Sequence, residues 1–132
     1  MKKIIIDGKN AVLGRLASYS AKESLKGNEI IIVNSNNVII TGNVEGIREK
    51  YLRRRKLGGS SRKGMRQPTN PERILKKTIE RMLPKSGRGV EALKRIRCYN
   101  EIPKNYEESD KIKTSNEIVK GVSLKKIAQL IK

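Results

Sequence analysis

The side chains with the clearest chemistry lie in one stretch, YLRRRKLGGSSRKGMRQP, at residues 51–68. This stretch holds seven Lys and Arg side chains, no acid, and few apolar residues in its middle. Guanidinium groups bind phosphate oxygens in pairs, and lysine ammonium groups bind them as point charges. So much like charge in one segment requires an anionic partner. Nucleic acid is the commonest such partner, ahead of an anionic membrane.

The positive charge is concentrated in the middle of the chain. The 132 residues carry a net charge of +18. Residues 51–100 hold sixteen Lys and Arg against three acids, a net +13, whereas residues 1–50 carry +3 and residues 101–132 carry +2. The length suits a single domain with a real core, so we expect one domain over 1–132 with a cationic middle third.

Most site chemistries are excluded by composition. The chain has no His and only Cys98, which rules out a structural zinc site and an internal disulfide. Cys98 lies in a predicted strand, where a buried structural thiol is the usual role. The acids are scattered, and Asp7, which follows a strand, is more typical of a turn than of catalysis. We therefore predict no enzyme activity, no cofactor and no metal.

Two glycine-rich segments resemble nucleotide loops only in part. GGSSRKGM lacks the Gly-Lys-Ser/Thr ending of a P-loop, and GRGVEA at 87–92 has no strand before it. We expect these glycines instead to let the backbone approach a phosphate strand, at 58, 59 and 64 in the loop and at Gly87 and Gly89 before a helix.

The apolar pattern alternates strands with helices. We predict strands at KIIID, EIIIV, VIIT and RIRCY, and helices beginning near Ala11, Val44, Pro71, Arg88 and Ser123. Asn10 is expected to cap the first helix, and Thr69 or Asn70 the third, with Pro71 at its first position. Residues 100–116 are polar and predict a loop. The pattern favours an α/β layered fold and leaves the pairing across Asn34–Asn37, hairpin or parallel, open.

The ends of the chain add little. The start, MKKIIIDGKN, has too short an apolar run for a signal peptide, and no stretch approaches the roughly 18 apolar residues of a membrane span. We expect a cytoplasmic protein with no membrane partner and no small-molecule substrate.

Aromatic residues indicate how a nucleic acid would be read. With no Phe or Trp and only four Tyr, the chain cannot stack many bases, so it should read phosphates and shape. Folded RNA offers such a shape. Two alternatives remain: a general nucleic-acid-compacting architectural protein, for which no apolar wedge is evident, and a small nucleotide-using enzyme, which lacks the catalytic groups.

Several segments together resemble a known family. IIIDGKNAVLGRLAS, IIVNSNNVIITGN, RQPTNPERIL and MLPKSGRGVEALKRIRCYNEIP, in this order, are similar to the universal large-subunit ribosomal protein thirteen family in its archaeal and eukaryotic form. The resemblance covers about residues 3–103, and the tail at 104–132 matches only loosely. Where the family often has Arg-Gly before Met-Leu-Pro, this chain has Glu80-Arg81.

The resemblance implies a three-layer α/β/α fold around a mostly parallel four-stranded sheet. The residue pattern itself adds a basic extended loop at about 57–70 and a C-terminal helix. The resemblance favours parallel pairing across Asn34–Asn37. It also implies a structural, non-enzymatic protein that binds large-subunit ribosomal RNA early in assembly, beside neighbouring ribosomal proteins. The candidate RNA-binding residues are Arg15, Arg53, Arg54, Arg55, Lys56, Arg62, Lys63, Arg66, Arg73, Lys85, Arg88, Lys94, Arg95 and Arg97.

Overall fold

The computed structural model describes residues 2–56, 68–107, 111–113 and 121–131, with the backbone alone at 55, 56 and 113. Its main sheet has the strand order β4-β2-β1-β5. Strands β1 (Lys3–Asp7), β2 (Glu29–Val33) and β4 (Ile96–Cys98) are parallel, and β5 (Ile112–Lys113) adds a two-residue edge beside β1. The isoleucine runs meet in register, with Ile4 opposite Ile30 and Ile6 opposite Ile32.

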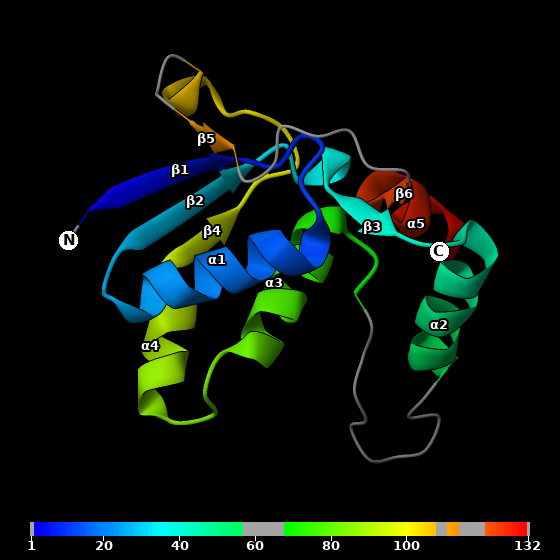
Figure 1. Ribbon diagram of the computed structural model, residues 1–132, viewed down its shortest axis with the longest axis horizontal. Helices are drawn as coiled ribbons and strands as arrows, with labels where there is room; N and C mark the ends of the chain where they lie inside the picture. Colours follow the sequence, from blue (N-terminus) through cyan, green and yellow to red (C-terminus); the bar gives the residue numbers. More distant parts are fainter. Residues whose placement is uncertain (1, 57–67, 108–110, 114–120, 132) are drawn as a thin grey trace.

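The connections between these strands place the helices. Helix α1 (Leu13–Leu25) joins β1 to β2, and α3 (Pro71–Met82) and α4 (Gly87–Lys94) precede β4. The connections from β1 to β2 and from β2 to β4 move in the same direction across the sheet. Because such crossovers are right-handed, their helices lie on one face of the sheet. Figure 1 shows α1, α3 and α4 together on that face.

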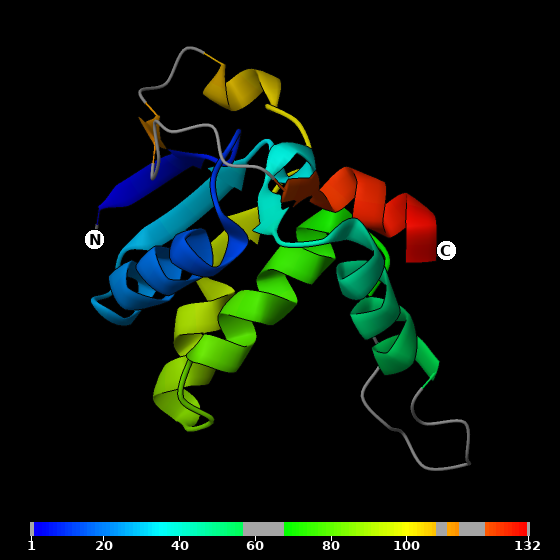
Figure 2. The same ribbon diagram turned by 45° about the vertical axis from the view of Figure 1, so that its right-hand side comes forward.

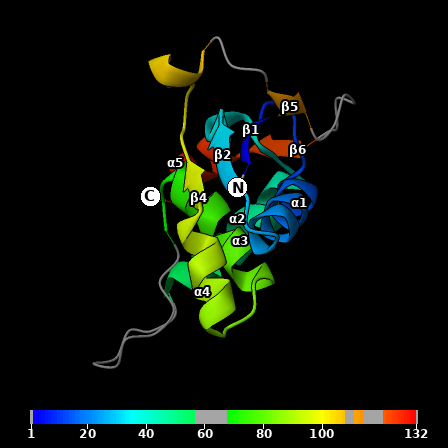
Figure 3. The ribbon, with the colours of Figure 1, turned by 90° about the vertical axis from the view of Figure 1, so that its left-hand side faces the viewer.

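The return from β4 to β5 runs in the opposite direction across the sheet. By the same handedness rule it should pass over the other face. Figure 3 shows this segment, with the short 3-10 turn η2 (Lys104–Tyr106), on the side away from α4. Ile31 and Val33, which alternate with the core-facing Ile30 and Ile32, have no exposed area. Both faces of β2 are therefore covered, as its unbroken apolar sequence predicts.

A second group of elements lies beyond the carboxyl ends of the strands (Figures 1 and 2). Strand β3 (Ile39–Thr41) pairs antiparallel with β6 (Gly121–Ser123), which leads into α5 (Leu124–Ile131). Helix α2 (Val44–Lys56) packs against α5, and α5 also contacts α3 and the turn η1 (Ser35–Asn37). Tyr51 and Ile127 belong to the same apolar cluster as Ile6 and Leu75, so the two groups share one core.

The α/β class is confirmed, and the arrangement differs from the expectation in three respects. The predicted strand VIIT does not pair with EIIIV in either direction; β3 pairs with β6 instead. The fourth strand of the main sheet comes from residues predicted to be loop. Helices α2 and α5 lie at the end of the sheet, so the second layer over it is the η2 segment, not a long helix.

Local backbone geometry explains these differences. Asn34 has φ 59, in the left-handed region, and redirects the chain into η1 before a hairpin can form. Ile39 then donates its backbone N–H to the Ala11 carbonyl, 2.8 Å away, which holds β3 near the start of α1. Asn10 also has a positive φ, 62, and is not the predicted cap; Val12 is the residue before the helix, and α1 begins at Leu13.

The core of α3 generates the first prediction. Leu75 has no exposed area and belongs to the main apolar cluster. Leu75→Ala should lower the free energy of unfolding by about 2–5 kcal/mol, because it removes buried methyl groups and leaves a cavity. Arg73→Gln, two residues away on the exposed side, should change it by less than about 1 kcal/mol. Urea unfolding of both variants measures this, and equal losses would contradict the assignment of faces.

The turn between α3 and α4 leads to the second prediction, which concerns two glycines. Gly89 is buried, and a Cβ there would overlap the Pro84 carbonyl oxygen, so this glycine serves packing and not the phosphate approach expected of it. Gly87 has open space. Gly89→Ala should cost about 1–3 kcal/mol through overpacking, whereas Gly87→Ala should be neutral or stabilising. Thermal melting that ranks the two variants the other way would refute this account of the turn.

Candidate nucleic-acid interface

The start of α3 is fixed by two asparagine side chains. Asn70 is the N-cap, and its Oδ1 accepts a hydrogen bond from the backbone N–H of Glu72 at 3.3 Å. The Asn100 Oδ1, just past β4, accepts from the same N–H at 3.0 Å, and Asn100 Nδ2 donates to Asn70 Oδ1 at 3.0 Å. The capping prediction is confirmed for Asn70. The second amide ties the helix to the end of the sheet and so sets the position of its basic side.

Three cations follow one side of α3. Arg73, Lys76 and Lys77 have helical i, i+3, i+4 spacing, while Ile74, Leu75 and Ile79 face the core. Together with Glu80 and with Leu93 of α4, these cations line a hollow of about 470 Å³ that also reaches Pro68 and Thr69. Lys76 and Lys77 were not among the candidate residues. Their spacing from Arg73 is the signal in the sequence that could have identified them.

The turn and helix after α3 continue the basic surface. Lys85, Arg88 and Lys94 are all exposed. A second hollow, of about 430 Å³, lies between α3 and α4 and includes Lys85, Pro84 and Val90. The structure thus places Arg73 on α3, Arg88 and Lys94 on α4, which contacts α3, and Lys85 in the turn between them.

The candidates on α2 divide into exposed and packed residues. Arg53 is exposed, whereas the Arg54 guanidinium lies 5.6 Å from the centroid of the buried Tyr51 ring. Burial raises the pKa of the Tyr51 hydroxyl, against the opposing charges of Arg54 and Arg81. Arg55 and Lys56 end the helix, and Arg62, Lys63 and Arg66 lie outside the described residues, as does most of the predicted loop. The RNA-binding role of these residues stays a prediction.

Arg95 and Arg97 are not brought into the basic surface. Arg95 Nη1 donates to the Ser24 carbonyl at the end of α1 at 2.9 Å, and its Nη2 lies 4.0 Å from the Glu91 carboxylate. That side chain therefore links α1 to α4. Arg97 lies between Ile96 and Cys98 in β4, and those two side chains pack on the face of the sheet that the helices cover. Since successive side chains of a strand point to opposite faces, Arg97 points to the other face. Arg15 is exposed in the first turn of α1.

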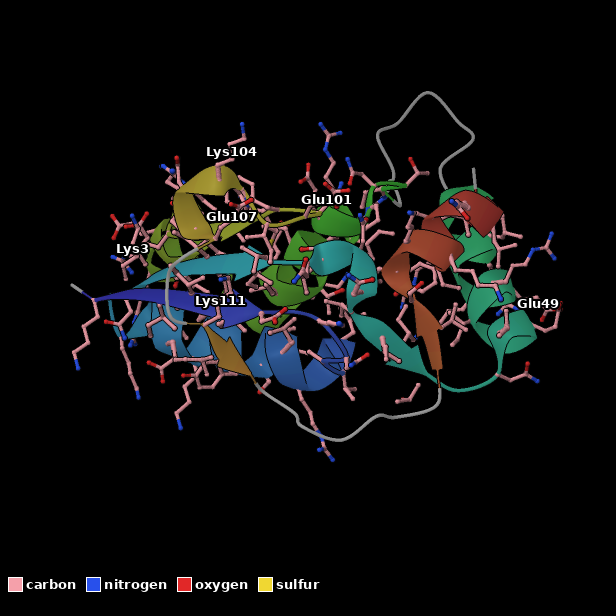
Figure 4. The ribbon with its side chains drawn as sticks, turned by 90° about the horizontal axis from the view of Figure 1, so that it is seen from above. Lys3, Glu49, Glu101, Lys104, Glu107 and Lys111 are labelled. Carbon is pink, nitrogen blue, oxygen red and sulfur yellow. The ribbon has the colours of Figure 1, made fainter. Side chains whose placement is uncertain are left out.

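The opposite face has mixed charge. Figure 4 shows Lys3, Lys104 and Lys111 around the η2 segment with Glu101 and Glu107 among them. The Lys3 ammonium lies 5.5 Å from the Tyr106 ring centroid, and Lys111 Nζ donates to the Glu107 carbonyl at 3.0 Å. On this face, therefore, acids accompany the cations.

Cys98 and the acidic side chains of the described residues provide no reactive or metal-binding site. Burial raises the pKa of the Cys98 thiol to about 12; the nearby Lys76 charge opposes that shift and Glu72 adds to it. A thiol of this kind is neutral at physiological pH and a poor nucleophile. Within the described ranges, no three His, Cys, Asp or Glu side chains gather closely enough to hold a metal ion. None of the described helices has the length and apolar character needed to cross a bilayer.

Comparison with known proteins places this geometry in a family. The family model of ribosomal protein L13 matches residues 1–105. The large ribosomal subunit protein uL13 of Thermoplasma volcanium is 44% identical over 116 residues, 87% of this chain and 84% of that protein. The uL13 of Thermoplasma acidophilum is 44% identical over 128 residues, 96% of this chain and 90% of that protein.

A third relative, the uL13 of Methanocaldococcus jannaschii, is 40% identical over 129 residues, 95% of this chain and 94% of that protein. The segments that carried the resemblance, from IIIDGKNAVLGRLAS to MLPKSGRGVEALKRIRCYNEIP, fall inside the matched residues. The resemblance is therefore confirmed: the chain belongs to the ribosomal protein L13 family.

Proposed function

We propose that this protein binds large-subunit ribosomal RNA and stabilises its fold during assembly, mainly through phosphate contacts and beside neighbouring ribosomal proteins. Membership of a family of structural ribosomal proteins confirms the prediction that the chain is not an enzyme and assigns it a structural role in the ribosome. The finer statement, direct binding of ribosomal RNA, rests on the cationic surface.

The observation that supports the proposal most strongly is the one-sided charge. Sixteen cations and three acids occupy residues 51–100. Most of the described cations lie on α2, α3 and α4 or in the turn between α3 and α4, whereas Arg95 and Arg97 do not. Two of those three acids are engaged: Glu80 lies 3.7 Å from Lys77, and Glu91 lies 4.0 Å from Arg95. Most of the positive charge is thus left for a polyanion. The opposite face, with its mixed charge, is suited to protein neighbours.

A general nucleic-acid-compacting protein would also carry such charge. That function predicts equal affinity for any duplex, often with an apolar wedge between base steps. The large apolar side chains exposed in the described residues, Met82, Val90 and Ile112, lie on separate elements and form no such wedge. A surface shaped by two packed helices favours recognition of one folded RNA.

The third prediction concerns salt. If about six cations contact phosphates, log affinity for ribosomal RNA should fall linearly with log salt, with a slope of about −4 to −5, since each contact contributes roughly 0.7–0.9. Arg88→Gln should reduce the slope by about one contact's worth. Lys104→Gln, which removes a charge from the opposite face, should leave it unchanged.

The measurement is a salt titration of the intact protein with a large-subunit ribosomal RNA fragment and with a random RNA duplex of equal length. The fragment should bind more tightly at moderate salt, because fit to a folded surface is not screened as charge is. Equal affinities at every salt concentration would reject the ribosomal RNA proposal in favour of general compaction.

A further inference from the structure

Three hollows lie along α3, and neighbouring ones share lining residues. The hollow beside Leu93 shares Thr69 and Arg73 with one at the N-terminus of the helix, which is about 490 Å³ in volume. It shares Lys77, Glu80 and Leu93 with the hollow at the C-terminal end. We define these three hollows together as the α3 groove. It runs the whole length of a twelve-residue helix, about 18 Å at 1.5 Å per residue.

Cations line the groove along its length. Lys125 of α5 and Arg73 stand at the N-terminal hollow, Lys76 and Lys77 at the middle one, and Lys85 at the far end. The cations therefore follow a line, as the phosphates of a single strand do.

Apolar residues line the groove together with these cations. Leu93 lines both the middle and the C-terminal hollow, Pro68 lines the first of these, and Val90, 52% exposed, lines the second. A phosphate gains nothing from contact with apolar side chains, whereas the face of an unpaired base is stabilised by such contact. Bases of RNA are accessible in this way only in loops, bulges and single-stranded ends.

Polar groups inside the groove suit base edges more than phosphates. Glu80 lies in its middle, where a carboxylate repels phosphate but can accept a hydrogen bond from a base amino group. The N-terminal hollow is lined by Asn36 and Gln129, and also by Asn70 and Asn100, whose side chains are already engaged at the start of α3. Asn and Gln amides donate and accept together, which is what a base edge requires.

We propose that the α3 groove holds a short single-stranded segment of ribosomal RNA, with its phosphates on Arg73, Lys76 and Lys85 and an unpaired base over Leu93. This inference rests on the proposed function, since it names the form of RNA that the surface takes. It adds base contact to a protein whose few aromatic residues predicted recognition by phosphate and shape alone.

The experiment uses fluorescence anisotropy with the intact protein. Three kinds of RNA probe are used. The first is a large-subunit ribosomal RNA fragment that the protein binds, the second is a set of overlapping ten-nucleotide oligomers that together cover this fragment, and the third is a hairpin duplex with the same charge as one oligomer. At least one oligomer should bind more tightly than the hairpin at moderate salt.

Arg73→Gln/Lys76→Gln should weaken the binding of that oligomer about tenfold or more, because two charged hydrogen bonds are lost. The control Lys2→Gln/Lys104→Gln removes the same charge from two exposed residues outside the groove and should change it less than twofold. Thermal melting shows that each variant is folded; if the first is not, Lys85→Gln replaces it.

A second pair of variants separates base from phosphate at Glu80. Lys77→Gln first removes the ion pair of 3.7 Å, so that no cation is released when the acid is changed. On that background, Glu80→Ala should weaken oligomer binding severalfold if the carboxylate accepts from a base. Tighter binding would place a phosphate there and overturn the base assignment.

The outcomes distinguish this inference from the proposed function. If no oligomer binds, if the hairpin binds as well as the oligomers, or if Arg73→Gln/Lys76→Gln has no more effect than the control, the groove is not a single-strand site. The fragment can still exceed the random duplex in each of those cases. Equal binding of fragment and random duplex instead rejects the proposed function.

Discussion

Mutual repulsion among the cations of residues 51–100 is the constraint on which the rest of this structure depends. A net +13 in fifty residues opposes close packing of the helices that carry it. The apolar cluster offsets this cost: Ile30, Ile32 and Ile96 of the sheet pack with Leu75 and Ile79 of α3 and have no exposed area. The fold is thus held from within by apolar contacts, while the cations stay on its surface.

The handedness of the crossovers determines where that charge lies. Because β1-to-β2 and β2-to-β4 progress in one direction, α1, α3 and α4 share a face, and cations of α3 and apolar residues of α4 line one groove. The return to β5 passes over the other face and brings Glu101 and Glu107 there. One topological rule therefore separates a cationic side from a mixed one, which a ribosomal protein can use to contact RNA on one side and protein on the other.

Local patterns in the sequence predicted most elements because their signals are local. The isoleucine runs identified β1 and β2, and Asn70 with Pro71 identified the start of α3. What could not be predicted depends on distant partners. Strand β3 needs β6, eighty residues later, and the groove needs Leu93 beside Lys77, which only the packing of α4 on α3 provides. Arg95 and Arg97 looked like their basic neighbours, yet one links two helices and the other points to the far face.

Lysine footprinting of the assembled subunit tests the central claim most directly. The protein is acetylated free and within ribosomes, and the reactivity of each lysine is compared by mass spectrometry. If the α3–α4 side is the RNA interface, Lys76, Lys85 and Lys94 should become protected by at least about tenfold, since charge-assisted contacts bury their ammonium groups. Their protection should exceed that of Lys104 on the mixed face. Protection of Lys104 with Lys76 and Lys85 still reactive would contradict the account.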